Sequence, residues 1–182
     1  NMASTAQASR LVIDYRNATD TVVGEHGVSQ AEMQGVASTV QEHHDRLTAE
    51  HDGGEQRWMD LPDDTALADE IVAFADEVRD QYDDFLLIGI GGSSLGAIAT
   101  IQAVANPHRN LLPKEQRGGP RIFFLDNPDP EKITATLEFV NLERTLVNVV
   151  TKSGQTAETM ANFLVVRQAL IDAVGEEQAS KQ

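Results

Sequence analysis

The sequence has no cysteine among its 182 residues, which excludes disulfide scaffolds, thiolate nucleophiles and cysteine zinc sites. It also has few basic residues, with 14 lysines and arginines against 29 aspartates and glutamates and a formal net charge of −15. Nucleic-acid binding requires clustered positive charge, so we expect no nucleic-acid partner. No apolar run approaches the roughly 18 residues of a transmembrane helix, and no secretory signal pattern opens the chain. We therefore expect no membrane partner and a cytoplasmic location.

The negative charge is concentrated in the first part of the chain. Residues 1–84 carry 19 acidic and 5 basic side chains (net −14), whereas residues 85–182 carry 10 and 9 (net −1). An anionic ligand is therefore better accommodated by the second part. The acidic surface is compatible with a high-salt cytoplasm and equally with an ordinary acidic protein, and both interpretations stay open.

Helical signals dominate residues 1–84. Ser29 and Glu32 have the spacing of a capping box and predict a helix from 29 to about 50. A second helix is predicted over about 65–82, because apolar residues recur there at steps of four, three and four, as on one buried face: Leu67, Ile71, Phe74 and Val78. We expect a mostly helical N-terminal extension over residues 1–84.

Histidines near the first helix allow a metal site as an alternative. His44 and His51 are seven residues apart, and Asp45 is close to both. Solvent-facing histidines are common on polar helices, whereas a ligand set needs convergent geometry. We therefore predict no metal site.

Residues 85–174 alternate between apolar runs and helical patterns. The runs at 85–90, 121–125 and 146–150 predict three strands, and Asp129 followed by Pro130 predicts the start of one of the intervening helices. Strands connected by crossover helices form parallel sheets. The predicted fold class is α/β, a three-layer α-β-α arrangement with an open parallel sheet.

Two turns rich in glycine and hydroxyl groups, 91–96 and 151–156, follow the first and third predicted strands. If the first strand is central, these turns flank the crevice where open α/β sheets bind ligands. Glycine lets the backbone approach an anion, and hydroxyl and N–H groups at a helix N-terminus bind it. Either turn alone would suit a simple strand-to-helix connection, but two on neighbouring strands favour a phosphate ligand.

Nucleotide-binding motifs fit these turns less well. The pattern Gly89-x-Gly91-x-x-Ser94 lacks the third glycine of the dinucleotide fingerprint, and no Lys-Ser/Thr pair follows Gly96 as in a P-loop. Asp126 ends the second strand, where a ribose-binding acid would lie, so a nicotinamide enzyme remains an alternative. We expect no cofactor.

The segment GIGGSSLG at 89–96 resembles the first signature of the glucose-6-phosphate isomerase family, and TKSGQTAET at 151–159 resembles the second. Residues 58–62 and 112–117 are also similar to bacterial members. The resemblance covers about residues 57–174. It implies a sugar-isomerase (SIS) domain with flavodoxin-like strand order over residues 85–182.

The resemblance also implies roles for individual residues. The sugar phosphate would be held by residues of both turns: Gly92, Ser93, Thr151, Lys152, Ser153 and Thr156. Lys152 would act as a solvated charge beside the anion. Glu158 matches an acid that lies near the family's active site and orients other groups. Alternatively, Glu158 is a first-turn glutamate that interacts favourably with the helix dipole.

The implied reaction is the aldose–ketose isomerisation of glucose 6-phosphate to fructose 6-phosphate in glycolysis and gluconeogenesis, without metal or nucleotide. The family supplies the main acid and base from segments downstream of the second signature, and its SIS sheet has five strands. We therefore expect a domain truncated at its C-terminus, inactive alone and prone to self-association at an unpaired sheet edge. The full-length parent is expected to be a homodimer. The alternatives are a non-catalytic SIS module that senses a phosphosugar and an aminosugar isomerase.

Overall fold

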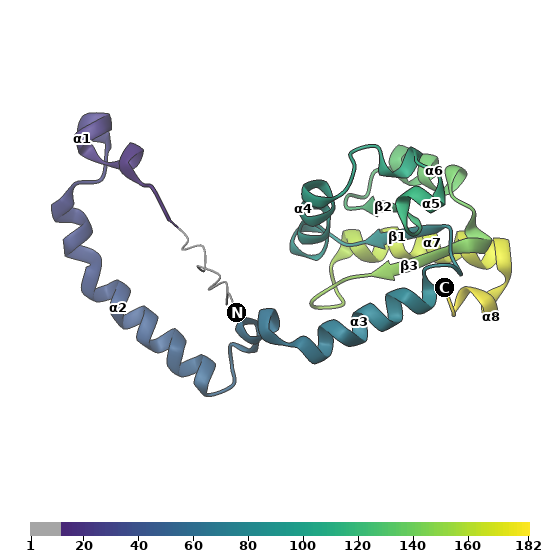
Figure 1. The fold of residues 1–182 in the computed structure, drawn as a ribbon, viewed down its shortest axis with the longest axis horizontal. Helices are drawn as coiled ribbons and strands as arrows, with labels where there is room; N and C mark the ends of the chain where they lie inside the picture. The colour runs from purple at the N-terminus through teal and green to yellow at the C-terminus, as the bar shows by residue number, and fades with distance from the viewer. Residues whose placement is uncertain (1–11) are drawn as a thin grey trace, which may run out of the picture. The chain divides into compact units, whose positions relative to one another are not determined.

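A computed structural model describes residues 12–182, and the chain divides into two compact units, Asn1–Thr65 and Ala66–Gln182 (Figure 1). The first unit contains short helical turns and one long helix: η1 (Arg16–Ala18), α1 (Asp20–Val23), η2 (Gly24–His26), α2 (Gln30–Asp52) and η3 (Arg57–Asp63). The capping box before α2 is confirmed. The Ser29 hydroxyl accepts the Glu32 N–H at 3.2 Å, and the Glu32 carboxylate accepts the Ser29 N–H at 2.8 Å.

The second unit carries the sheet. Its elements are α3 (Thr65–Val78), β1 (Asp84–Ile88), η4 (Gly91–Ser93), α4 (Leu95–Val104), η5 (Arg109–Leu111), α5 (Lys114–Arg117), β2 (Arg121–Leu125), α6 (Pro130–Phe139), η6 (Leu142–Arg144), β3 (Thr145–Val149), α7 (Ala157–Val174) and α8 (Glu176–Ala179). The three strands are parallel in the order β2-β1-β3, which confirms the predicted α/β class with its open parallel sheet. Within residues 12–182, no helix combines the length and apolarity needed to cross a membrane.

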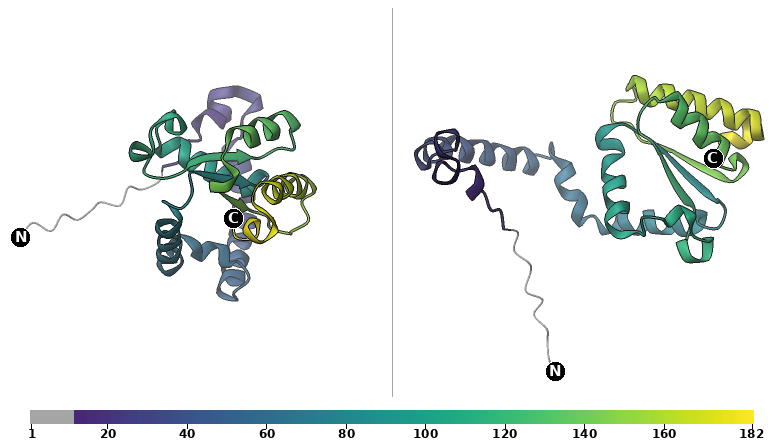
Figure 2. Two further views of the ribbon diagram at one scale, coloured as in Figure 1. Left: turned by 90° about the vertical axis from the view of Figure 1, so that its right-hand side faces the viewer. Right: turned by 90° about the horizontal axis from the view of Figure 1, so that it is seen from above.

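Helices cover both faces of this sheet. In two views, α6 and α7 lie on one side and α4 on the other (Figure 2). The start of α6 is confirmed, because the Asp129 carboxylate accepts the N–H groups of Glu131 and Lys132 and Pro130 occupies the first turn. Pro130 lacks only an N–H that the helix would leave unpaired.

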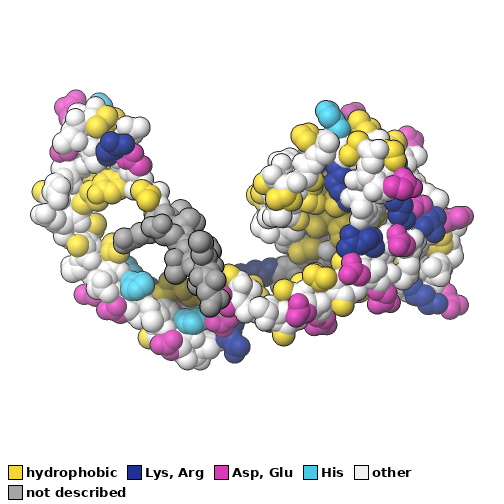
Figure 3. Space-filling view, viewed as in Figure 1, with side chains coloured by type: hydrophobic (Ala, Val, Ile, Leu, Met, Phe, Trp, Pro, Cys, Tyr) yellow, Lys and Arg dark blue, Asp and Glu magenta, His cyan; other side chains and the backbone are white. Residues whose placement is uncertain are grey.

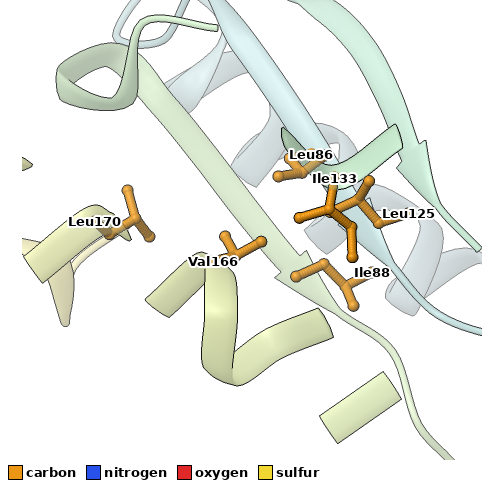
Figure 4. Packing of buried hydrophobic residues seen from close by; sticks show 6 residues of the cluster. All are labelled: Leu86, Ile88, Leu125, Ile133, Val166 and Leu170. Carbon is orange, nitrogen blue, oxygen red and sulfur yellow. The ribbon is translucent and has the colours of Figure 1, made fainter. Parts of the chain in front are cut away.

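The hydrophobic core lies between the sheet and the pair α6 and α7. Leu86 and Ile88 face the same side of the sheet, because side chains alternate along a strand, and buried Leu87 between them faces the other side. The register places Leu86 and Ile88 opposite Phe123 and Leu125 of β2. Six buried side chains form the cluster in Figure 4: Leu86, Ile88, Leu125, Ile133, Val166 and Leu170. This packing holds α6 and α7 against one face of the sheet.

A buried ion pair closes the opposite, amino end of the sheet. Asp84 opens β1 with no exposed surface, and its two carboxylate oxygens accept bonds of 2.6 and 2.8 Å from Arg121, its register partner on β2. The Asn141 N–H donates to the same carboxylate at 3.1 Å. A buried carboxylate needs such partners because leaving water costs several kcal/mol. At the end with the glycine-rich turns, the ion pair between Lys132 and Asp126 is partly exposed rather than buried.

The prediction that α3 buries one face is wrong for this structure. The helix forms and ends at Val78, but Ile71 is 58% and Phe74 54% exposed. Between them and the sheet residues Phe85 and Ile122 lies a groove of about 450 Å³. Figure 3 shows hydrophobic side chains gathered along this part of the second unit. The periodicity therefore predicts the apolar face of α3 correctly, but this face lines a groove and is not packed against the sheet.

Candidate functional site

The first glycine-rich turn connects β1 to α4. Gly91 has φ of +58°, a conformation that favours glycine, and starts the single turn η4. The Ser94 N–H donates to the Gly91 carbonyl at 3.0 Å, and the buried Ser94 hydroxyl donates to the same carbonyl at 3.3 Å. Ser94 therefore does not cap α4 with its side chain. Its hydroxyl stabilises the turn, while half-buried Ser93 and exposed Gly92 lie at the helix N-terminus.

The second turn connects β3 to α7 and holds itself by side-chain-to-backbone bonds. The Gly154 N–H donates to the Thr151 hydroxyl oxygen at 3.1 Å, and the Gln155 N–H donates to that of Ser153 at 3.1 Å. Because both hydroxyl groups act as acceptors here, each retains an O–H to donate to a ligand. Thr156 occupies the N-cap of α7 without a side-chain capping bond.

The two turns adjoin at Gly89, which follows β1. A Cβ atom placed on Gly89 would lie 3.0 Å from the Ser93 Cβ and 3.2 Å from the Val150 carbonyl oxygen. Ser93 belongs to the first turn, and Val150 immediately precedes the second. Only a residue without a side chain fits this approach at little cost. The absence of a Cβ at position 89 therefore lets the two turns come together at the carboxyl edge of the sheet.

All six predicted phosphate-binding residues lie in these adjoining turns. Gly92, Lys152 and Ser153 are exposed, whereas Ser93, Thr151 and Thr156 are half-buried. Glu158 is exposed in the first turn of α7. In the described part of the chain, neither the Lys152 ammonium group nor the Glu158 carboxylate is engaged in an ion pair of the protein itself. Both are therefore accessible from this edge.

The neighbouring turn after β2 contains a carboxylate that is already paired. The Lys132 ammonium group lies 2.6 Å from Asp126, and this hydrogen bond lowers the pKa of the Asp126 carboxyl group. The candidate ribose-binding acid is thus neutralised locally by a lysine. The arrangement reduces the repulsion that an anion at this edge would meet from Asp126.

Comparison with known proteins identifies the family. The phosphoglucose isomerase family model matches residues 70–182. The glucose-6-phosphate isomerase of Rubrobacter xylanophilus is 40% identical over 167 residues, which cover 91% of this chain and 37% of the relative. A probable glucose-6-phosphate isomerase of Haloquadratum walsbyi is 34% identical over 81% of this chain and 32% of the relative. The chain belongs to the phosphoglucose isomerase family.

A solved structure has a similar fold. The crystal structure of a hypothetical protein from Thermus thermophilus matches with a TM-score of 0.64 and 35% identity, over 81% of this chain and 33% of that one. The chain spans about a third of the length of the curated glucose-6-phosphate isomerases it matches. The second unit holds the segments 89–96 and 151–159 at one edge of a three-stranded sheet, whereas the family resemblance implies five strands.

Two residues near the alternative metal site, His51 and Asp45, contact other side chains of the protein. His51 Nε2 lies 2.7 Å from an Asp60 carboxylate oxygen, and Asp45 accepts a bond of 2.7 Å from Gln41. Residues 12–182 contain no group of three or more histidine, cysteine or acidic side chains arranged to hold a metal ion. Within these residues, His44 and His51 are thus not part of such a group.

Sequence reasoning missed the structural setting of two residues near this edge. The apolar run predicts that Gly89 belongs to the first strand. In the structure, Gly89 follows the strand and lies close to Ser93 and Val150, where the two turns adjoin. A glycine inside an otherwise large apolar run was the available signal. Asn162 interrupts the apolar face of α7 and is buried at 1% exposure. A polar residue at a core position was the corresponding signal there.

Proposed function

We propose that this chain is the phosphate-binding part of a glucose-6-phosphate isomerase. The supporting observation is the pair of hydroxyl-rich turns that adjoin at Gly89, each leading into the N-terminus of a helix longer than two turns. In this proposal, the phosphate of glucose 6-phosphate or fructose 6-phosphate is held by Gly92, Ser93, Thr151, Lys152, Ser153 and Thr156.

The chemistry of the turns suits a dianionic phosphate. The first N–H groups of α4 and α7 have no partners within their helices, and the helix dipoles favour negative charge there. The hydroxyl groups of Ser93, Thr151 and Thr156 add donors that rotate toward the ligand. Lys152 contributes a positive charge that remains hydrated, so the site depends mainly on directed hydrogen bonds.

The isomerisation itself requires further groups. Opening the sugar ring needs an acid, and moving a proton between C2 and C1 through an enediol needs a carboxylate base and stabilisation of negative charge. The family resemblance assigns the main acid and base to segments that align after residue 182. We therefore expect this chain to bind the substrate without converting it, with Glu158 orienting neighbouring groups in the longer protein. A homodimeric, cytoplasmic parent remains part of the same proposal.

Calorimetric titration of the chain with fructose 6-phosphate, at low and high salt, tests the phosphate site. The double variant Ser93→Ala/Thr156→Ala should weaken binding at least about tenfold, because each substitution removes a donor to a charged group. The matched control is Ser38→Ala/Thr134→Ala, which removes two exposed hydroxyl groups from α2 and α6. It should leave the affinity unchanged.

Binding that survives the first double variant would contradict the assignment of these turns. If the folded chain binds no fructose 6-phosphate and no inorganic phosphate, the proposal fails for this chain. If the turns bind the sugar phosphate but the full-length parent does not isomerise it, a non-catalytic sensing module becomes the better assignment. A coupled assay for glucose 6-phosphate formation by the full-length parent distinguishes the sensing module from the isomerase.

A further inference from the structure

Asn162 is a buried polar side chain for which the phosphate site as described has no role. It lies in the second turn of α7 and is 1% exposed. Its Nδ2 donates to the carbonyl oxygens of Leu125 at 3.4 Å and Asn127 at 3.3 Å. Its Oδ1 is buried and has no hydrogen-bond partner in the described part of the chain. A buried acceptor without a partner costs free energy, so an apolar side chain of similar volume would be cheaper for packing alone.

The Leu125 carbonyl is shared with the first phosphate turn. Leu125 ends β2, and its carbonyl also accepts the Gly89 N–H at 3.3 Å. Gly89 is the residue at which the two turns adjoin. One carbonyl oxygen is therefore bonded both to the backbone that starts the first turn and to the helix that follows the second.

Asn162 lies in the half of α7 that follows the second turn. The helix begins directly after Thr156, and its packing residues Val166 and Leu170 lie further along in the core. The Asn162 amide hydrogen-bonds the N-terminal half of α7 to β2, the strand on the far side of β1 from β3. A shift or rotation of this half of α7 would move Thr156 relative to Ser93.

We propose that Asn162 is a positioning residue that holds the two phosphate turns in a fixed relation, through the Leu125 carbonyl and the backbone at Asn127. The inference rests on the proposed function, since it concerns the same phosphate site. Preorganised donors bind an anion more tightly because less conformational freedom is lost on binding. An amide group that supplies the Nδ2 donor also carries Oδ1, so the free energy lost by the unpaired Oδ1 accompanies the positioning role.

The variant Asn162→Leu tests the proposal, because leucine keeps the number of side-chain heavy atoms and the branch at Cγ but removes the donor. Affinity for inorganic phosphate and fructose 6-phosphate should fall about fivefold or more, measured where the NMR spectrum shows a fully folded protein. Stability in urea should be equal or higher, because the unpaired buried oxygen is gone. Amide hydrogen exchange at Gly89 and in the turns should become faster. A merely structural role would lower stability and leave the affinity of the folded protein unchanged.

The variant Asn162→Asp provides a second, pH-dependent measurement. An ionised carboxylate beside two carbonyl oxygens repels them, whereas the protonated acid again donates a bond, and burial raises the pKa of such a group. Affinity relative to the unsubstituted chain should therefore recover as the pH falls from about 7 to about 5. The matched control is Gln168→Glu, the same amide-to-acid change on the exposed face of α7, and it should show no recovery.

Unchanged affinity together with unchanged exchange at Gly89 in Asn162→Leu would overturn the inference. If the unsubstituted chain binds no phosphate, the proposed function fails, and the exchange measurement then decides the inference alone. Faster exchange at Gly89 and in both turns would support the positioning role even in that case. Unaltered exchange in the same case would reject it.

Discussion

The two units of the chain use their apolar residues differently. In the second unit, strands and helices bury a cluster centred on Leu86, Ile88 and Leu125. In the first unit, none of residues 12–65 is buried, and the apolar residues of α2 at Met33, Val36 and Val40 are 40–61% exposed. The second unit therefore gains stability from burial, whereas α2 depends on hydrogen bonds and capping along its own length.

The largest expected difference between the units comes from shortening a core side chain. Leu86→Ala should lower the free energy of unfolding by about 3 kcal/mol, because Leu86 is fully buried and the cavity left behind closes only partly. Val40→Ala is the matched change in α2 and should cost less than about 0.5 kcal/mol. Urea denaturation followed by circular dichroism measures both. A comparable loss from Val40→Ala would show that the apolar side of α2 is packed in solution.

The same comparison explains which parts of the fold could be predicted from the sequence. The parallel sheet and the capping box at Ser29 depend on patterns within short stretches of sequence, and both predictions are confirmed. The apolar pattern predicts a first strand that begins at Phe85, because Asp84 is charged. Asp84 enters the strand because Arg121, 37 positions later, pairs with its carboxylate. A local pattern carries no information about such a partner.

The candidate site shows the same division. The glycine and hydroxyl content of the turns predicts their place, and these residues do lie at one edge of the sheet. How the turns adjoin could not be predicted, because it depends on the space around Gly89, and the hydrogen-bond partners of buried Asn162 lie 37 and 35 positions away in the sequence. The apolar face of α3 was predicted correctly as a pattern, but burial depends on what covers it, which periodicity does not specify.

A smaller effect is expected from removing the capping box of α2. Ser29→Ala should cost about 1 kcal/mol of helix stability, because the Glu32 N–H loses its acceptor. Ser38→Ala lies in the exposed middle of the same helix, where alanine is the better helix former, so it should be neutral or slightly stabilising. Amide exchange at Glu32 and Met33 reports the change directly. Equal exchange in the two variants would contradict a role for the cap.

The smallest expected effect is electrostatic and concerns the contact between α2 and η3. His51 Nε2 lies 2.7 Å from Asp60, and Arg57 lies 3.3 Å from the same carboxylate. The hydrogen bond to Asp60, with the nearby charge of Asp52, raises the pKa of His51, and the same bond lowers the pKa of Asp60.

The raised pKa sets the pH range in which this contact stabilises the first unit. The contribution of His51 to the stability of the first unit is fully present below the ordinary histidine pKa of about 6.5. It is lost as the pH rises through the raised pKa of His51. The Asp60 contribution to stability is lost only in acid, as the pH falls through its lowered pKa.

Asp60→Asn should lower the pKa of His51 toward its ordinary value, whereas Asp63→Asn should leave it unchanged. NMR titration of the His51 imidazole measures both. A His51 titration insensitive to Asp60→Asn would mean that η3 does not contact the end of α2 in solution. In that case, α2 would depend on its cap and its own backbone hydrogen bonds, and the contrast with the second unit would be sharper.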